Sequence, residues 1–227
     1  MSSVAFKEED SASEHRSLSR IVYRALDVLG ATIGLILCAP VLLLICVAIR
    51  LESPGPAIFR QRRLGRGKRP FTVHKLRTMR LEADPSIHKE YIQELILGSE
   101  RSHTSDSGRN LYKLAADDRV TRTGRFLRKT SLDELPQLYD VLKGHMSLVG
   151  PRPVIPYEAD LYPAHYDLRF SVRPGLTGLW QVNGRNERTY KEMVELDVAW
   201  ARRRSLGLYL LILAKTPWTL LRRRGAA

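Results

Sequence analysis

Two adjacent acids, Asp133 and Glu134, are the residues best suited to chemistry in this sequence. They lie in the run Ser131-Leu-Asp-Glu-Leu-Pro-Gln-Leu138, where Ser131 and Glu134 have the spacing of a capping box and predict a helix over residues 130–144. The N-terminus of a helix keeps an aspartate ionised and attracts phosphate. Paired carboxylates also suit Mg²⁺, which prefers oxygen ligands and bridges phosphate oxygens. Because an ionised aspartate attacks phosphorus, the pair indicates phosphoryl transfer in two steps.

Each acid also has a purely structural explanation, since Glu134 can complete the cap and Asp133 can be a first-turn acid favoured by the helix dipole. Basic residues elsewhere favour the chemical interpretation. Arg152 lies between two prolines, whose restricted backbone would hold the guanidinium ready for two-pronged phosphate contact. The other candidates are cations at a strand end or in tight turns and a third acid: Lys75, Arg77, Arg173, Arg185 and Asp197.

An uncharged apolar run covers residues 28–49, which is long enough to span a bilayer. Pro40 interrupts it and predicts a break or kink, and each half is long enough for about one leaflet. Arginines stand on both flanks, including Arg24 and Arg50, and positive charge favours the cytosolic side for both ends. We therefore expect residues 18–50 to form a re-entrant helix-break-helix element, with a single full span as the alternative. Asp27 and Arg24 are expected to form an ion pair on the helix surface.

The composition narrows the class of partner. A formal net charge of +13 over 227 residues predicts anionic partners. Because no nucleic-acid-binding module is recognisable, phosphorylated substrates and anionic membrane lipids are favoured over nucleic acid. The cysteines, Cys38 and Cys46, flank Pro40 in the apolar run and are expected to be packing residues.

The rest of the chain predicts an α+β fold, mainly helical, in one small cytosolic catalytic domain over residues 51–227. Residues 1–17 are polar and are expected to be a disordered tail. Residues 57–61 and 70–75 alternate like strands around a Gly-rich turn. Residues 205–221 predict an amphipathic helix lying in the membrane interface, with packing on the domain core as the alternative.

Five motifs together carry a family resemblance: Lys75-Leu-Arg-Thr-Met79, Ser131-Leu-Asp-Glu-Leu-Pro-Gln-Leu138, Gly150-Pro-Arg-Pro153, Arg173-Pro-Gly-Leu-Thr-Gly178 and Gln181-Val-Asn-Gly-Arg-Asn186. By these motifs the chain resembles the monotopic phosphoglycosyl transferases, bacterial sugar transferases that start exopolysaccharide, O-antigen and glycoprotein glycan assembly. The resemblance runs from about residue 20 to the C-terminus and implies the minimal catalytic form.

The resemblance implies that Asp133 attacks the β-phosphate of a UDP-sugar, releasing UMP and leaving a sugar-phosphate on the aspartate. Undecaprenyl phosphate would then take the sugar-phosphate. Mg²⁺ would bind at Asp133 with Glu134 as a metal neighbour or base, and arginines and lysines among the candidates would hold phosphates. The implied place is the cytoplasmic face of the bacterial inner membrane, with the family's re-entrant helix. A homodimer is compatible with the sequence, although no motif specifies one.

Three positions depart from the family pattern: Ala39 precedes Pro40 where serine is common, His145 replaces a usual acid, and Asp140 replaces a common asparagine with no evident consequence. Two other functions stay open. A glycosyl transferase would move the sugar alone and release UDP. A basic membrane adaptor would bind phosphorylated partners without turnover, and would leave the Asp133-Glu134 pair unexplained.

Overall fold

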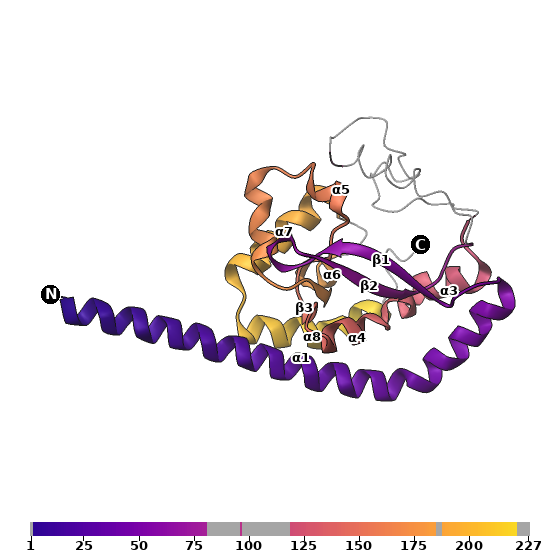
Figure 1. The fold of residues 1–227 in the computed structure, drawn as a ribbon, viewed down its shortest axis with the longest axis horizontal. Helices are drawn as coiled ribbons and strands as arrows, with labels where there is room; N and C mark the ends of the chain where they lie inside the picture. The colour runs from indigo at the N-terminus through magenta and orange to yellow at the C-terminus, as the bar shows by residue number, and fades with distance from the viewer. Residues whose placement is uncertain (1, 81–95, 97–118, 185–187, 222–227) are drawn as a thin grey trace.

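The computed structural model describes residues 2–80, 96, 119–184 and 188–221, with side chains from residue 19 onward. Helix α1, Ser2–Glu52, runs beneath the rest of the molecule in Figure 1 and curves upward at its C-terminal end. Residues 2–17 belong to this helix, whereas the sequence predicted a tail; the division of the chain at residues 17 and 50 stays a prediction.

Pro40 stands inside α1, and the helix continues through it. The expected helix-break-helix is therefore corrected to one continuous, bent helix. A proline removes one backbone hydrogen bond and crowds the preceding turn, which bends a helix whose remaining bonds survive. Figure 1 shows the result as a curve that brings the end of α1 up toward α3, Arg122–Thr130.

Both ends of the apolar part of α1 contact the same domain. Near its start, Ala31 is fully buried in the main core. Near its end, Ile49 packs with Leu76 and Leu127, and the Glu52 carboxylate accepts hydrogen bonds from the first backbone N–H groups of α3. The helix is thus held to the domain at two places separated by most of its apolar length.

The predicted hairpin is confirmed. Strands β1, Ile58–Leu64, and β2, Pro70–Leu76, pair antiparallel from Ile58 opposite Leu76 to Leu64 opposite Pro70. Their connection contains a short 3-10 helix, η1 (Arg66–Lys68), in which Gly67 has a φ of 67°. Glycine adopts this left-handed conformation without a steric cost, so the Gly-rich run reverses the chain here.

The helix predicted over residues 130–144 is wrong in detail. Ser131 ends α3 with a left-handed φ of 60°, and its side chain is not the hydrogen-bonding cap of η2 that the spacing predicted. A 3-10 turn, η2 (Leu132–Glu134), follows, and α4 covers Gln137–Leu142. The basic run before Ser131 is helical in its own right, because Thr121 caps it by accepting from the Gly124 N–H. The capping-box spacing therefore marked a junction between two helices.

The second half of the chain completes the domain with a two-stranded parallel pair, β3 (Ser147–Val149) and β4 (Gly175–Thr177), and with helices around it. The helical elements are α5 (Pro156–Ala159), η3 (Ala164–Ser171), α6 (Leu179–Val182), α7 (Tyr190–Arg203) and α8 (Leu206–Leu221). Figure 1 shows α5 and α7 above the hairpin and α8 beside α1. The expected α+β, mainly helical class is confirmed.

One face of α8 packs on the domain and the other does not. Tyr209 and Ile212 are buried in the main core, whereas Leu211 and Trp218 are about half exposed. The helix predicted over residues 205–221 is therefore present as α8. The alternative that this helix packs on the domain core is correct for one of its faces. Its position in a membrane interface stays a prediction, which the uncovered apolar face favours.

Candidate active site

The two acids lie in η2, immediately after the left-handed Ser131. Both are half-buried, so their carboxylates remain within reach of solvent. Lys75, near the end of β2, places its Nζ atom 2.8 Å from Glu134 Oε1. The structure therefore brings together three of the predicted site residues, from segments nearly 60 residues apart in sequence.

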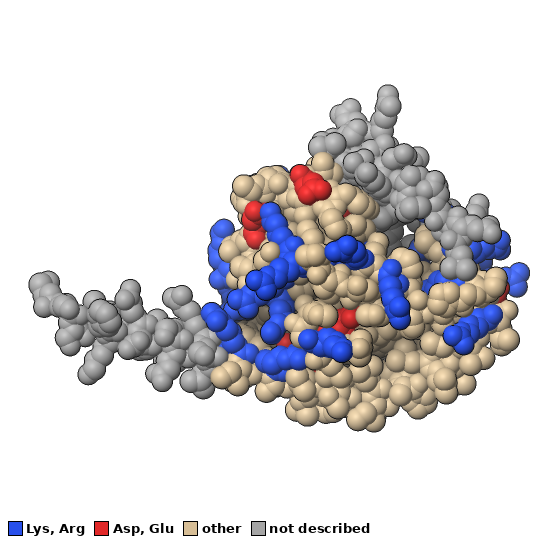
Figure 2. Space-filling model, in the orientation of Figure 1, with Lys and Arg blue, Asp and Glu red and all other residues tan. Residues whose placement is uncertain are grey.

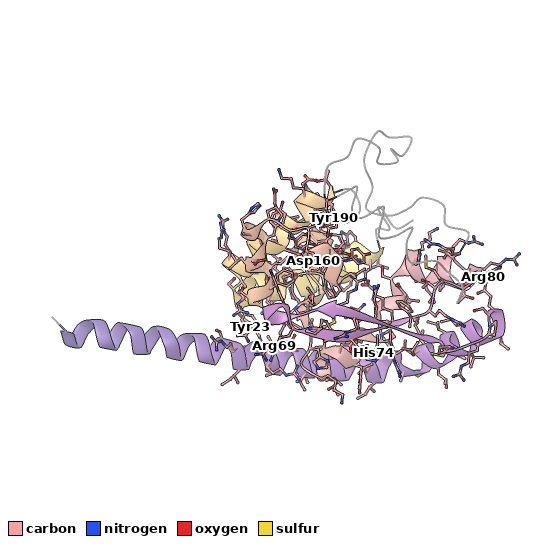
Figure 3. All side chains as sticks on the ribbon, turned by 45° about the horizontal axis from the view of Figure 1, so that its top comes forward. Tyr23, Arg69, His74, Arg80, Asp160 and Tyr190 are labelled. Atoms are coloured by element: carbon pink, nitrogen blue, oxygen red, sulfur yellow. The ribbon has the colours of Figure 1, made fainter. Side chains whose placement is uncertain are left out.

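A buried acid fixes the strand that carries Lys75. Asp140 of α4 accepts from the backbone N–H of His74 at 2.9 Å, and its other oxygen lies 2.7 Å from His74 Nδ1. Asp140 is 1% exposed, so this two-pronged contact is shielded from water. Figure 3 shows His74 on the hairpin above α4. The contact locks β2 against the helix that follows η2 and so sets the position of Lys75 relative to Glu134.

A second group of contacts fixes the backbone of Arg152. Its N–H donates to Asp197 Oδ2 at 3.1 Å, and its carbonyl accepts from Arg169 Nη2 at 3.1 Å. The neighbouring Pro153 carbonyl accepts from Arg63 Nη1 at 2.9 Å. Both backbone groups of Arg152 are thus engaged, while the contact of its guanidinium with phosphate stays a prediction.

Asp197 is fully buried in α7 and pairs with Arg169. Burial raises the pKa of the Asp197 carboxyl to about 6, although the charge of Arg169 opposes the rise. Arg169 also donates to the Tyr162 hydroxyl, which hydrogen-bonds to Tyr190. Asp197, the third candidate acid of the sequence, thus accepts from the backbone of Arg152, and its predicted part in substrate binding stays a prediction.

Two of the motifs pack backbone against backbone. The Gly150 N–H donates to Thr177 O, and the Gly175 N–H donates to Pro151 O. A Cβ on Gly175 would lie 2.0 Å from the Gly150 nitrogen, closer than any real contact. This close approach requires glycine, so the Gly-Pro-Arg-Pro loop and the Arg-Pro-Gly-Leu-Thr-Gly loop depend on each other.

Two other predicted residues, Arg77 and Arg173, make their described contacts away from the acids. Arg77 is 5% exposed and donates to the Ser53 and Pro54 carbonyls just after α1, so its contacts are structural. Arg173 lines a pocket beside the N-terminal part of α1. Arg185 lies outside the described residues. The roles proposed for them at a substrate phosphate stay predictions.

The acid turn and the Arg152 loop meet the hairpin at different places. Lys75 pairs with Phe59 in β1, whereas Val154 bridges Leu64 at the other end of that strand. Five residues of extended chain correspond to roughly 17 Å. The Arg152 loop therefore meets the hairpin near one end of β1, and the acid turn meets it near the other end.

The donor set suits Mg²⁺ bound together with a substrate. The described residues contain no group of three or more His, Cys, Asp or Glu able to hold a metal ion. Asp133 and Glu134 supply two neighbouring carboxylates, and Mg²⁺ commonly takes one or two protein carboxylates and completes its shell with water and substrate phosphates. The acid pair fits that pattern.

Sequence reasoning missed the partners of three buried charges. The predicted ion pair of Arg24 and Asp27 is wrong: Arg24 donates to the Val141 and Leu142 carbonyls, and Asp27 accepts from Ser147, Leu148 and Tyr209. Asp140 and Arg169 were given no role. The position of Asp27 at the start of an apolar helix was the available sign in the sequence that this acid has a buried partner.

The family model described as "Bacterial sugar transferase" matches residues 18–223. Relatives include the galactosyl transferase CpsE of Streptococcus agalactiae, 42% identical over 207 residues that cover 91% of this chain and 43% of the relative. The undecaprenyl-phosphate galactose phosphotransferase of Salmonella typhimurium is 38% identical over 208 residues, 92% of this chain and 42% of the relative. The exopolysaccharide production protein ExoY of Rhizobium meliloti is 38% identical over 201 residues, 88% of this chain and 86% of the relative.

The chain thus spans less than half the length of several curated relatives that it matches and most of the length of another. The matched residues include the acid turn, the hairpin and both glycine loops. The family expected from the motifs is therefore confirmed, and the chain belongs to the bacterial sugar transferases.

Proposed function

We propose that the protein transfers a sugar-1-phosphate from a UDP-sugar to undecaprenyl phosphate and thereby starts the assembly of a surface polysaccharide or glycan. The observation that carries the proposal is the Asp133-Glu134 turn, bonded to Lys75, in a domain fixed to a long apolar helix whose outward side chains are exposed. The names of relatives support it, since one is an undecaprenyl-phosphate galactose phosphotransferase and another, from Caulobacter vibrioides, a UDP-glucose:undecaprenyl-phosphate glucose-1-phosphate transferase.

The chemistry would proceed through a covalent intermediate on Asp133. A carboxylate oxygen of Asp133 forms a bond to the β-phosphorus, while the bond from that phosphorus to the oxygen bridging the two phosphates breaks and UMP leaves. An oxygen of undecaprenyl phosphate then attacks the same phosphorus. The acyl phosphate bond breaks, which restores the Asp133 carboxylate and yields undecaprenyl-diphosphate-sugar.

The neighbouring side chains would position and neutralise the reacting phosphates. Lys75 holds Glu134 beside Asp133 and adds a positive charge at the turn. Arg152, fixed through its backbone, would contact phosphate oxygens with its guanidinium. Mg²⁺ held by Asp133 and Glu134 would neutralise charge on the diphosphate. Asp197 and Arg169 act as positioning residues for Arg152.

The proposal includes a re-entrant α1 with the domain on the cytoplasmic face of the inner membrane. One helix, Ser19–Glu52, is long and apolar enough to cross a membrane by length and composition. Its outward side chains are exposed, with Leu37 at 71% and Leu44 at 70%. Because Asp27 and Glu52 both contact the same domain, a helix crossing the full bilayer would have to separate contacts that are joined here.

The test is nucleotide release by the full chain in lipid nanodiscs with UDP-sugars, undecaprenyl phosphate and Mg²⁺. We expect release of UMP and loss of at least about 10³-fold in rate for Asp133→Asn, because the amide cannot act as the nucleophile. Asp160→Asn is the matched control, since Asp160 is an exposed acid at the end of α5, and it should retain the wild-type rate.

Different products would redirect the proposal. Release of UDP would favour a glycosyl transferase that moves the sugar alone. Undiminished UMP release by Asp133→Asn would exclude the aspartyl intermediate. Labelled sugar-phosphate trapped on the wild-type protein without lipid acceptor, and lost in Asp133→Asn, would support the two-step route directly.

A further inference from the structure

A pocket of about 730 Å³ lies where the N-terminal part of α1 meets β3, α8 and the turn of the hairpin. Five arginines line it: Arg20, Arg24, Arg66, Arg173 and Arg204. They come from four separate segments of the chain, so the fold gathers like charges that the sequence disperses. Figure 2 shows Lys and Arg concentrated on the left of the molecule.

The positive charge in the pocket is not balanced by its own acid. Among the described lining residues Asp27 is the one carboxylate, and it already accepts from Ser147 Oγ, the Leu148 N–H and Tyr209 Oη at 2.7–2.8 Å. Burial and then the charge of nearby arginines lower the pKa of Arg173. Like charges this close repel each other, and an anion would relieve the repulsion.

The pocket also has an apolar side that continues onto the exposed surface of α1. Val28 and Leu29 line it, and Leu29 is 60% exposed along the helix that faces lipid in our proposal. Arg204 lies over the Tyr23 ring, with its guanidinium carbon 5.7 Å from the ring centre. A ligand that fits both parts has an anionic head and a hydrocarbon tail.

The pocket is separate from the acid turn. None of Lys75, Asp133, Glu134 and Arg152 is among its described lining residues, so an occupant would not touch the reacting carboxylates. This arrangement suits a lipid that stays bound and seats the domain, and it does not suit the lipid that reacts.

We propose that this pocket binds the phosphate headgroup of an anionic membrane phospholipid and so anchors the domain to the start of α1. Arginines bind phosphate oxygens with paired N–H groups, and their attraction is stronger at the poorly solvated apolar side. The acyl chains would leave along Val28 and Leu29 into the bilayer. The pocket volume is within the range of sites for small ligands.

The test counts lipids retained by the full chain in dodecyl maltoside, by native mass spectrometry, during titration with phosphatidylglycerol or phosphatidylcholine. We expect phosphatidylglycerol to bind and the double variant Arg173→Gln, Arg204→Gln to weaken it about 30-fold, as for two lost arginine contacts. The matched control is Arg202→Gln, Arg203→Gln, which removes two exposed charges of α7 outside the pocket and should change affinity less than about twofold.

A second pair of variants changes exposed residues, so that a loss of lipid binding is not mistaken for misfolding. Arg66→Glu places an acid at the pocket from the exposed hairpin turn, and Arg62→Glu makes the same change on β1 outside the pocket. Only Arg66→Glu should weaken phosphatidylglycerol. Equal weakening by pocket and control variants, or equal binding of phosphatidylcholine, would overturn the proposal. Displacement of the lipid by millimolar inorganic phosphate would assign the pocket to free phosphate, and preferential displacement by undecaprenyl phosphate would assign it to the substrate.

Discussion

At the scale of single residues, several buried or half-buried charges among the described residues bond to backbone groups of other elements. Arg77 and Arg24 both end on carbonyl oxygens of other elements. Asp197 and Arg169 hold the two backbone groups of Arg152. An arginine in a family motif, such as the buried Arg77, can therefore hold backbone in place.

Asp197 gives a prediction about pH. Its folded pKa of about 6 lies above the ordinary value of 3.8, so between these values the folded protein binds a proton more readily than the unfolded chain. The stability contributed by this group therefore falls as pH rises from about 4 to 6 and is constant above that range. Asp197→Asn should remove this slope from thermal unfolding midpoints measured between pH 4 and pH 8 in one detergent.

The same variant separates positioning from binding. Loss of the carboxylate frees Arg169 and shifts the Arg152 backbone, so we expect kcat to fall by roughly 10²-fold with a smaller change in KM. The exposed Asp160→Asn variant should keep both the slope and the rate. An unchanged pH slope in Asp197→Asn would show that another group titrates in this window.

At the scale of elements, the glycine loops and the hairpin decide where the site lies. The Gly-Pro-Arg-Pro loop, which begins at Gly150, bonds to β4, and Val154 just after it bridges β1. Strand β2 of the same hairpin places Lys75 against Glu134 of η2. Each element of the site thus depends on a partner far away in sequence. Short irregular loops become precise only when their backbone groups are bonded in this way.

Gly175→Ala should damage this arrangement. The added Cβ would meet backbone atoms of Gly150 at 2.0 Å, and backbone cannot move aside as a side chain end can. We expect a loss of about 3 kcal/mol in unfolding free energy, at the upper end of overpacking costs, and at least about tenfold lower activity. Gly207→Ala is the control, since nothing lies within 4 Å of its Cβ, and helix propensity should gain at most about 1 kcal/mol. Chemical unfolding in detergent compares the two, and equal stabilities would contradict the close approach.

At the scale of the whole molecule, the apolar part of α1 gives one side of the protein an uncharged surface. The lower edge of the molecule in Figure 2 shows neither acidic nor basic side chains, and exposed leucines such as Leu37 and Leu43 belong to α1. Contiguous apolar surface of this kind requires a cover in water. A membrane is the cover that we propose for this side.

Labelling tests the side on which α1 begins and ends. In a Cys38→Ser, Cys46→Ser background, Ser19→Cys and Ser53→Cys mark the two ends of the part of α1 that is long and apolar enough to cross a membrane, Ser19–Glu52. We expect a membrane-impermeant maleimide to label both in inverted inner-membrane vesicles and neither in intact spheroplasts. Labelling of one position from each side would establish a full span and sink the re-entrant arrangement.

The sequence by itself determined the features that depend on near neighbours. The hairpin at residues 58–76, the apolar stretch of α1 and the helix at Leu206–Leu221 follow from periodicity, turn glycines and composition, and the spaced motifs identified the family. The acid pair was also visible, because adjacent carboxylates after a basic run need no folding to be recognised.

Only the tertiary structure decided the partners of the charges and the path of α1. Asp27 and Tyr209 are 182 residues apart in sequence, and Arg63 and Pro153 are 90 apart. Local patterns carry no information about contacts at that separation, so a helix-surface pair with Arg24 was the natural expectation for Asp27. Pro40 likewise predicts a bend within its own helix, whereas the contacts of Ala31 and Ile49 that hold the two ends of the apolar part of α1 to one domain join elements far apart in sequence. Long-range packing selects among locally equivalent conformations, and here it selected the site.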